Sequence, residues 1–163
     1  MDRHIIRDRI GRRDVAAEDE HGGVRAGQAE GGHDFDAGDA GDSIEPYLER
    51  IAAEIAKYGG KKTMIFLPLI RTSRLMTEIC NRLGLDAEHV DGNSPDRAEI
   101  LQRFAAKDRG VICNAMLLTE GWDDPTVDCI INLRPTKSRS LYVQIIGRGL
   151  RLNPPLKKEC LIL

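Results

Sequence analysis

Two arginines near the end of the sequence, in the stretch VQIIGRGLRL (143–152), are the strongest candidates for chemistry. In a helix, Gln144, Arg148 and Arg151 fall at i, i+4 and i+7 and form one polar stripe between two apolar flanks. Such a helix is expected to be mostly buried, and a buried cation is costly unless an anion pairs with it. A planar guanidinium can bind a phosphate through two N–H groups at once. The stripe therefore indicates either ion pairs with carboxylates inside the fold or a phosphate-bearing ligand from outside.

The elements that must position these arginines alternate between apolar strands and amphipathic helices. A leading helix is expected over residues 43–58. Strands are expected in the stretches KTMIFLPL, DAEHVDG, GVICNA, VDCIINLRP and KKECLIL, and helices in TSRLMTEICNRLG, SPDRAEILQRFAAKDRG and SRSLYVQIIGRGLRL. This alternation predicts an α/β fold with a parallel sheet and helices on both faces. Ligands of such sheets bind beyond the carboxyl ends of the strands, so chemistry is expected in the loops after Leu69, Cys113 and Leu133.

The first 42 residues differ in composition from the rest of the chain. They contain no Leu and no Lys, but eight Gly, eight Asp and three of the four His. So little apolar area cannot offset the entropy lost on ordering, which predicts a disordered polar tail over residues 1–42 and a domain over 43–163. The tail carries 6 basic and 11 acidic side chains, and the domain carries 18 and 15. This mild basic excess permits a nucleic-acid partner without requiring one.

Cysteine usage and hydropathy predict a cytoplasmic protein. The four cysteines are widely spaced in apolar runs and form no C-x-x-C pair, which is typical of a reducing compartment. No apolar run approaches the roughly 20 residues that span a bilayer, and the first residues lack the continuous apolar core of a signal peptide. For the same reason no membrane partner is expected, and the irregular spacing of the histidines gives no reason to expect a metal site.

Four segments, in order along the chain, resemble the motif series of the C-terminal RecA-like domain of superfamily 2 helicases, the DEAD/DEAH-related translocases. They are MIFLPLIRTSRLMTEICNRLG, DGNSPDRAEILQRF, NAMLLTEGWDDPTVD and QIIGRGLR. Each lies in the expected strand and helix context, so the likeness is more specific than a lone G-R-x-x-R. The resemblance implies a RecA-like core over residues 64–163, truncated at its last strand. EGWDDP together with GRGLRL looks nearer the bacterial and phage DNA-repair and restriction-type members than the RNA helicases.

The resemblance also implies half of an ATP site. Arg148 and Arg151 would act as arginine fingers on ATP that a different, N-terminal RecA-like domain holds together with its Mg²⁺. Gln144 would orient these groups or the nucleotide. Asp123 would contact the ribose hydroxyls or the neighbouring domain, and Gly121 would allow close approach of the backbone.

Contacts with nucleic acid are implied for Thr119, which would bind a phosphate, and for Arg71 and Thr72, which match a loop that touches the backbone in relatives. Such contacts position a strand without reading its bases. Simpler alternatives stay open: Asp123 and Asp124 could form an Asx turn before Pro125, and Thr72 or Ser73 could be the N-cap of a helix. Trp122 is expected to pack beneath its loop.

Two elements of a complete helicase are missing from the sequence: the P-loop G-x-x-x-x-G-K-[ST] and a D-E-A-D or D-E-x-H carboxylate pair. Alone, the chain is not expected to hydrolyse ATP at a useful rate. It is expected to be a fragment, the C-terminal motor domain of an ATP-dependent helicase or translocase, with DNA as the preferred substrate. The alternative is a catalytically inactive nucleic-acid-binding or regulatory remnant of such a helicase.

Overall fold

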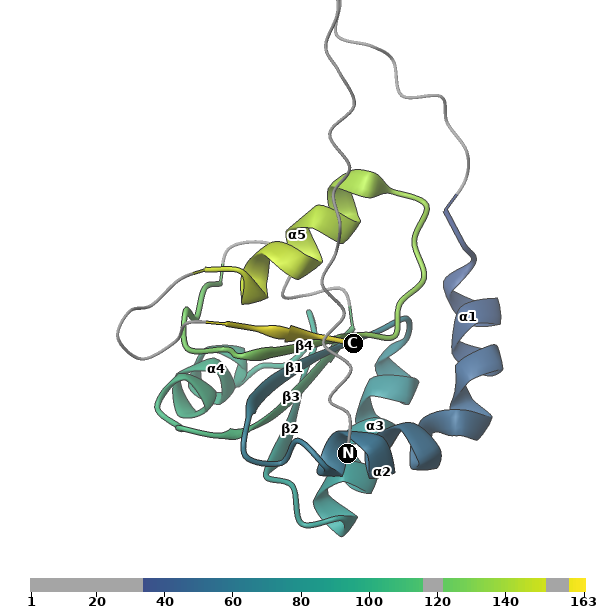
Figure 1. Cartoon of the computed structure of the whole chain (residues 1–163). Coiled ribbons are helices and arrows are strands. Elements are labelled where there is room, and N and C mark those ends of the chain that lie inside the picture. Colours follow the sequence, from purple (N-terminus) through teal and green to yellow (C-terminus); the bar gives the residue numbers. More distant parts are fainter. Residues whose placement is uncertain (1–33, 116–121, 152–158) are drawn as a thin grey trace, which may run out of the picture. The chain divides into compact units, whose positions relative to one another are not determined.

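The computed structural model describes residues 34–115, 122–151 and 159–163, in which helices alternate with parallel strands (Figure 1). The helices are α1 (Ala37–Ile44), the 3-10 helix η1 (Glu45–Tyr47), α2 (Leu48–Ala56), α3 (Ile70–Arg82), α4 (Arg97–Ala105) and α5 (Arg139–Gly149). The strands are β1 (Lys62–Leu67), β2 (Ala87–Val90), β3 (Gly110–Ala115), β4 (Cys129–Asn132) and β5 (Leu161–Ile162). They form one sheet in the order β2-β3-β1-β4-β5, with every pair parallel. The predicted α/β parallel sheet is therefore confirmed.

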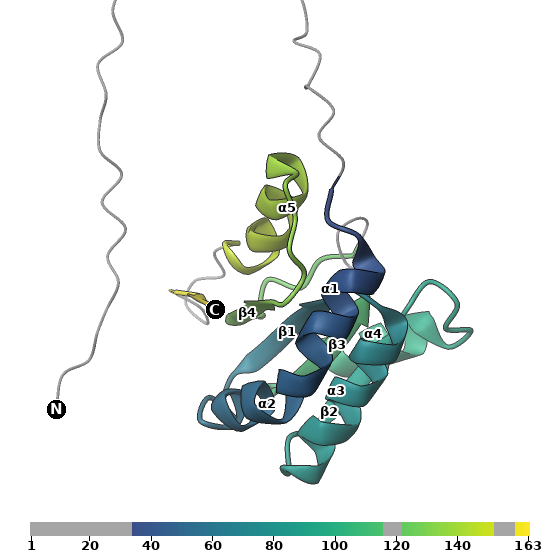
Figure 2. The same cartoon turned by 90° about the vertical axis from the view of Figure 1, so that its right-hand side faces the viewer.

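The side chains of the central strand β1 alternate between two apolar cores. Ile65 and Leu67 lie in the core that α2 and α3 cover, whereas Met64 and Phe66 lie in the core that α4 and α5 cover. Successive residues of a strand face opposite sides of the sheet, so a strand that is apolar throughout needs a helical layer on each side. Figures 1 and 2 show these two layers.

Helix α1 is held in place by contacts at both of its ends. Asp34, just before it, accepts hydrogen bonds from Thr136 Oγ1 at 2.9 Å and from the backbone N–H of Lys137 at 2.7 Å, both in the loop after β4. Further along, Gly41 packs against Leu69, because a Cβ at Gly41 would lie only 2.2 Å from Leu69 Cδ1. These long-range contacts fasten α1 along the carboxyl edge of the sheet.

The predicted boundary of the polar tail is therefore wrong. Residues 37–42 belong to α1, although composition placed them in a disordered segment. Local composition could not reveal partners more than 25 residues away in sequence, such as the Leu69 side chain. The remainder of the predicted tail, residues 1–33, lies outside the described residues.

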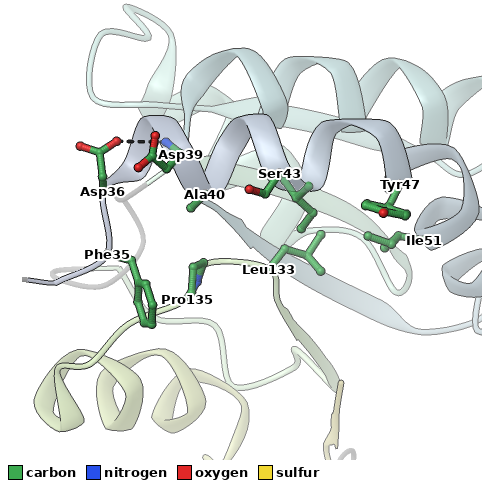
Figure 3. A pocket seen from close by; sticks show the side chains of 10 residues that line it. Phe35, Asp36, Asp39, Ala40, Ser43, Tyr47, Ile51, Leu133 and Pro135 are labelled. Atoms are coloured by element: carbon green, nitrogen blue, oxygen red, sulfur yellow. Dashed lines mark hydrogen bonds between the residues drawn. The ribbon is translucent and has the colours of Figure 1, made fainter.

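An apolar pocket of about 530 Å³ lies between α1 and the loop after β4 (Figure 3). Tyr47 and Ile51 line one end of it, Leu133 lies at its base, and Asp36 and Asp39 stand at the other end. Among the described residues, none of the predicted site residues lines this pocket.

Helix α5 is less buried than the sequence suggested. Ile145, Ile146 and Gly149 are buried on the side that faces the sheet. On the other side, Val143 is 58% exposed and Leu150 is 59% exposed. The expectation of a mostly buried helix is wrong because the sheet covers only part of its apolar surface. In the described part of the chain, the helices are also too short and too polar for a bilayer span.

Two glycines of α5 allow a matched test of this packing. A Cβ on Gly149 would lie 2.6 Å from Ile130 Cγ1 and 2.5 Å from Cys160 Sγ, whereas a Cβ on Gly147 would meet no atom within 4 Å. We expect Gly149→Ala to lower the free energy of unfolding by about 1–3 kcal/mol through overpacking. Gly147→Ala is expected to be neutral or stabilising, because alanine favours the helix. Urea denaturation would measure both, and equal effects of the two substitutions would contradict the close packing of α5 on β4.

Candidate functional site

The two arginines predicted to bind phosphate both contact the loop that precedes β4. Arg148 is half-buried and donates a hydrogen bond from Nη1 to the backbone oxygen of Trp122 at 2.6 Å. Arg151 lies just beyond α5 and forms an ion pair between Nη1 and Asp123 Oδ2, with 55% of its side chain exposed. The ion-pair alternative is thus observed for Arg151, and its partner is itself a predicted site residue.

A buried ion pair fixes this loop to the amino end of the central strand. Nζ of Lys62, the first residue of β1, lies 2.7 Å from Oδ2 of Asp124, and both side chains are almost fully buried. A lysine is rarely buried this deeply unless an anion pairs with it. Sequence reasoning missed Lys62; the available signal was a lysine at the head of an otherwise apolar strand.

Three other predicted residues gain no observed contact in this group. Gln144, one turn before Arg148, is exposed on α5. Thr119 and Gly121 lie outside the described residues. The roles suggested for all three therefore stay predictions.

The two residues predicted to touch nucleic acid at the start of α3 already have partners. Arg71 is ion-paired through Nη2 with Asp42, and its Nε lies 3.3 Å from Glu45 Oε2. Thr72 is buried, and its hydroxyl donates to the backbone oxygen of Leu69 at 2.9 Å. Leu69, not Thr72, is the N-cap of α3, and the Thr72 hydroxyl stabilises this first turn from inside the helix.

The predicted residues lie at two opposite edges of the sheet. Arg71 and Thr72 follow the carboxyl end of β1, where ligand contacts were expected. Arg148, Arg151 and Asp123 lie beside the amino ends, because a helix that connects parallel strands returns the chain to that edge. The arginines therefore lie away from the carboxyl ends, where ligand contacts were expected.

A second buried polar group, which sequence reasoning missed, links α3 to the end of β2. His89 Nδ1 lies 2.8 Å from Ser73 Oγ, and its Nε2 lies 2.9 Å from Asp91 Oδ2. The hydrogen bond with His89 lowers the pKa of the Asp91 carboxyl. Ser73 and Asp91 are fully buried, so this Ser-His-Asp chain fastens two elements together and offers no accessible nucleophile. The signal was the spacing of His89 and Asp91, since residues two apart along a strand share one face.

Comparison with known families shows that most of the chain matches a helicase family. The family described as "Helicase conserved C-terminal domain" matches residues 46–153. IRC3 of Saccharomyces cerevisiae, named as an ATP-dependent helicase, is 46% identical over 72 residues, which make up 43% of this chain and 10% of that protein. The protein irc3 of Schizosaccharomyces pombe, named as a mitochondrial ATP-dependent helicase, is 41% identical over 103 residues, or 62% of this chain and 17% of that protein. The chain thus spans less than a fifth of either relative.

Solved structures share the fold. A fragment of the HsdR subunit of a type I restriction enzyme from Vibrio vulnificus YJ016 aligns with a TM-score of 0.68 at 20% identity, covering 76% of this chain and 27% of that chain. Domain 2 of the DEAD-box helicase Mss116p, solved with an RNA duplex, aligns with a TM-score of 0.58 at 20% identity, covering 76% of this chain and 50% of that chain. At these identities the likeness concerns the fold alone, and it confirms the RecA-like architecture.

Proposed function

Because the chain belongs to the family of helicase conserved C-terminal domains, we propose that it is the C-terminal motor domain of an ATP-dependent DNA helicase or translocase, with Arg148 and Arg151 as its arginine fingers. ATP and Mg²⁺ would be held by a separate N-terminal motor domain. The two motor domains would close around the nucleotide, and the arginines would stabilise the charge that develops on its γ-phosphate.

The observation that carries this proposal is the placing of both guanidinium groups at one edge of the sheet, next to Trp122 and Asp123. A guanidinium presents five N–H donors in a rigid fork, which suits a phosphate as well as a carboxylate. Arg151 pairs with an accessible carboxylate, so an incoming phosphate could replace Asp123 without leaving a buried cation unpaired. Asp123 would then be available for a ribose hydroxyl or for the neighbouring domain.

Nucleic acid would bind at the opposite, carboxyl edge, where Arg71 and Thr72 follow β1 and the segment that contains Thr119 follows β3. Contacts of hydroxyl, guanidinium and backbone N–H groups with phosphates are independent of base sequence. The preference for DNA rests on the EGWDDP and GRGLRL segments.

The test is ATP hydrolysis by the full chain mixed with an N-terminal motor domain from a related helicase, in the presence of Mg²⁺. The mixture would be assayed without nucleic acid, with single-stranded DNA and with single-stranded RNA of the same sequence. We expect turnover only in the mixture, with greater stimulation by DNA. If the two chains associate but show no turnover, the non-catalytic remnant is the better description; greater stimulation by RNA would overturn the DNA assignment.

The ion pairs of Arg71 lead to a prediction about nucleic-acid affinity. Replacing Asp42 with Asn and Glu45 with Gln frees the guanidinium for phosphate, so the full chain is expected to bind a labelled single-stranded oligonucleotide roughly two- to fivefold more tightly. Fluorescence anisotropy at about 0.1 M salt measures this change, because a Debye length of about 10 Å then limits effects from remote charges.

The matched control removes the same number of carboxylates at a distance from Arg71. Glu49→Gln together with Glu54→Gln breaks the ion pairs of these two residues with Arg82 and Lys57. An equal gain in affinity from this control would mean that net charge alone is responsible. No gain from the Asp42 and Glu45 substitutions, in a chain that does bind the oligonucleotide, would contradict a role for Arg71.

A further inference from the structure

The ammonium group of Lys62 is saturated with partners inside the fold. Its Nζ lies 2.7 Å from Asp124 Oδ2, donates to Thr126 Oγ1 at 2.8 Å and donates to the backbone oxygen of Ala105 at 2.9 Å. It also lies 5.0 Å from the ring centroid of Phe104. Of the three N–H donors of an ammonium group, two form hydrogen bonds here, and Asp124 adds an ion pair.

Two of these partners, Asp124 and Thr126, are also hydrogen-bonded to each other. Oδ1 of Asp124 accepts hydrogen bonds from the Thr126 backbone N–H at 2.9 Å and from Thr126 Oγ1 at 2.5 Å. Asp124 Oδ2 accepts no hydrogen bond from the described residues, so the charge of the Lys62 ammonium, 2.7 Å away, compensates it. Removing the ammonium would leave a buried carboxylate oxygen uncompensated, and this favours movement of the loop towards water.

The same network reaches both arginines through the two residues that precede Asp124. The Phe104 ring, under the Lys62 ammonium, packs against Trp122 with 6.1 Å between ring centroids, and the backbone oxygen of Trp122 accepts from Arg148. Asp123, directly before Asp124, pairs with Arg151. Lys62 is therefore linked to the Arg148 contact through Phe104 and Trp122, and to the Arg151 contact through Asp124, the neighbour of Asp123.

We infer that Lys62 is a positioning residue that sets the geometry of Arg148 and Arg151 by holding the 122–126 loop, an inference that rests on the function proposed for these arginines. Lys62 lies on β1, more than 80 residues away in sequence from the arginines in and just beyond α5, and no hydrogen bond or ion pair joins it to either of them. It acts through the loop, by keeping Trp122 and Asp123 at fixed places beside the end of α5.

The experiment uses Trp122 as a reporter, because it is the single tryptophan of the chain. The full chain with Lys62→Met would be compared with Lys61→Met, the same substitution at the adjacent lysine, which lies 3.8 Å from Asp128 and has a third of its side chain exposed. Emission wavelength and quenching by acrylamide would be recorded at a temperature where circular dichroism shows both variants folded. We expect a red shift and stronger quenching for Lys62→Met only.

A folded Lys62→Met variant with the emission and quenching of the unaltered chain would overturn the inference, as would equal changes in Lys61→Met. If Lys62→Met does not fold, Thr126→Val replaces it, because this substitution removes the hydroxyl that bridges Lys62 and Asp124 while keeping the shape of the side chain. The same red shift is then expected, and its absence would count against the inference equally.

ATP hydrolysis in the two-chain mixture gives the second readout. A misplacement of about 1 Å can cost about 10²-fold in rate, so kcat is expected to fall by about that factor in Lys62→Met, with KM for ATP changed far less. A shifted Trp122 emission with an unchanged kcat would overturn the positioning role. If the unaltered mixture shows no turnover, the proposed motor function fails, whereas the fluorescence result still decides whether Lys62 holds the loop.

Discussion

Replacing Arg151 with alanine is expected to lower nucleic-acid-stimulated ATP hydrolysis by the two-chain mixture about 10³-fold or more, the range found when an arginine finger is removed. The reason is loss of a planar donor that stabilises charge on the γ-phosphate. Arg151→Lys is expected to be nearly as inactive, because an ammonium group cannot bind two phosphate oxygens through a fixed fork. Rates at saturating ATP and nucleic acid measure both effects.

The control for this prediction is Arg139→Ala, in the first turn of the same helix α5. Arg139 is exposed and belongs to no predicted site, so its loss changes net charge by the same amount without touching the cluster at the end of the helix. A rate within a few-fold of the unaltered chain is expected for this control. An Arg151→Ala mixture that retains most of its stimulated rate would show that Arg151 serves only to pair with Asp123.

Replacing Asp91 with alanine is expected to lower the free energy of unfolding by about 3 kcal/mol at pH 7, because it removes one partner from a buried polar group. Asp91 Oδ2 lies 2.9 Å from His89 Nε2, and Asp91 Oδ1 accepts from the backbone N–H of Asn93 at 2.7 Å. Urea denaturation measures the loss. Asp96→Ala is the control, since Asp96 is exposed and its side chain caps no helix N–H, so a small change is expected there.

The same carboxyl gives the stability difference a pH dependence. Its pKa is lowered in the folded chain, chiefly by the hydrogen bond with His89, relative to the unfolded value of about 3.9. The contribution of Asp91 is therefore fully present above about pH 4 and is lost as pH falls through the lowered pKa. The difference between the unaltered chain and Asp91→Ala is expected to narrow only below about pH 4. A difference that narrowed between pH 7 and pH 5 would contradict this assignment.

The parallel sheet could be predicted because its signal is local. A mostly apolar run such as KTMIFL indicates a strand that is covered on both faces. Helices between such runs indicate crossover connections and therefore parallel strands. The Lys62–Asp124 ion pair could not be predicted in this way, because the two residues are far apart in sequence and carry no shared pattern. The same limit applies to α1, whose glycines and aspartates are poor helix formers and which depends on partners such as Leu69.

The sequence predicted which arginines lie together in the candidate site, but not how the helix that carries them packs against the sheet. Helical spacing indicated that Arg148 and Arg151 share one stripe, and both contact the loop that precedes β4. It could not indicate how much of the apolar surface of α5 the sheet covers, because Ile146 and Val143, three residues apart in the helix, have equivalent side-chain character but differ in burial. Only the position of β4 decides between them, and helical periodicity holds no information about a neighbouring strand.

Helix α1 has a practical consequence for choosing the limits of a recombinant protein. The match to the helicase family begins at residue 46, whereas the described structure already includes α1 from Ala37. A chain cut at the edge of the match would uncover the surface around Leu69 and remove Asp42 and Glu45 from Arg71. The solubility of the shortened chain and its affinity for polyanions would then differ from those of the intact domain. Comparisons of purified domains across this family need to start from the folded unit and not from the homologous segment.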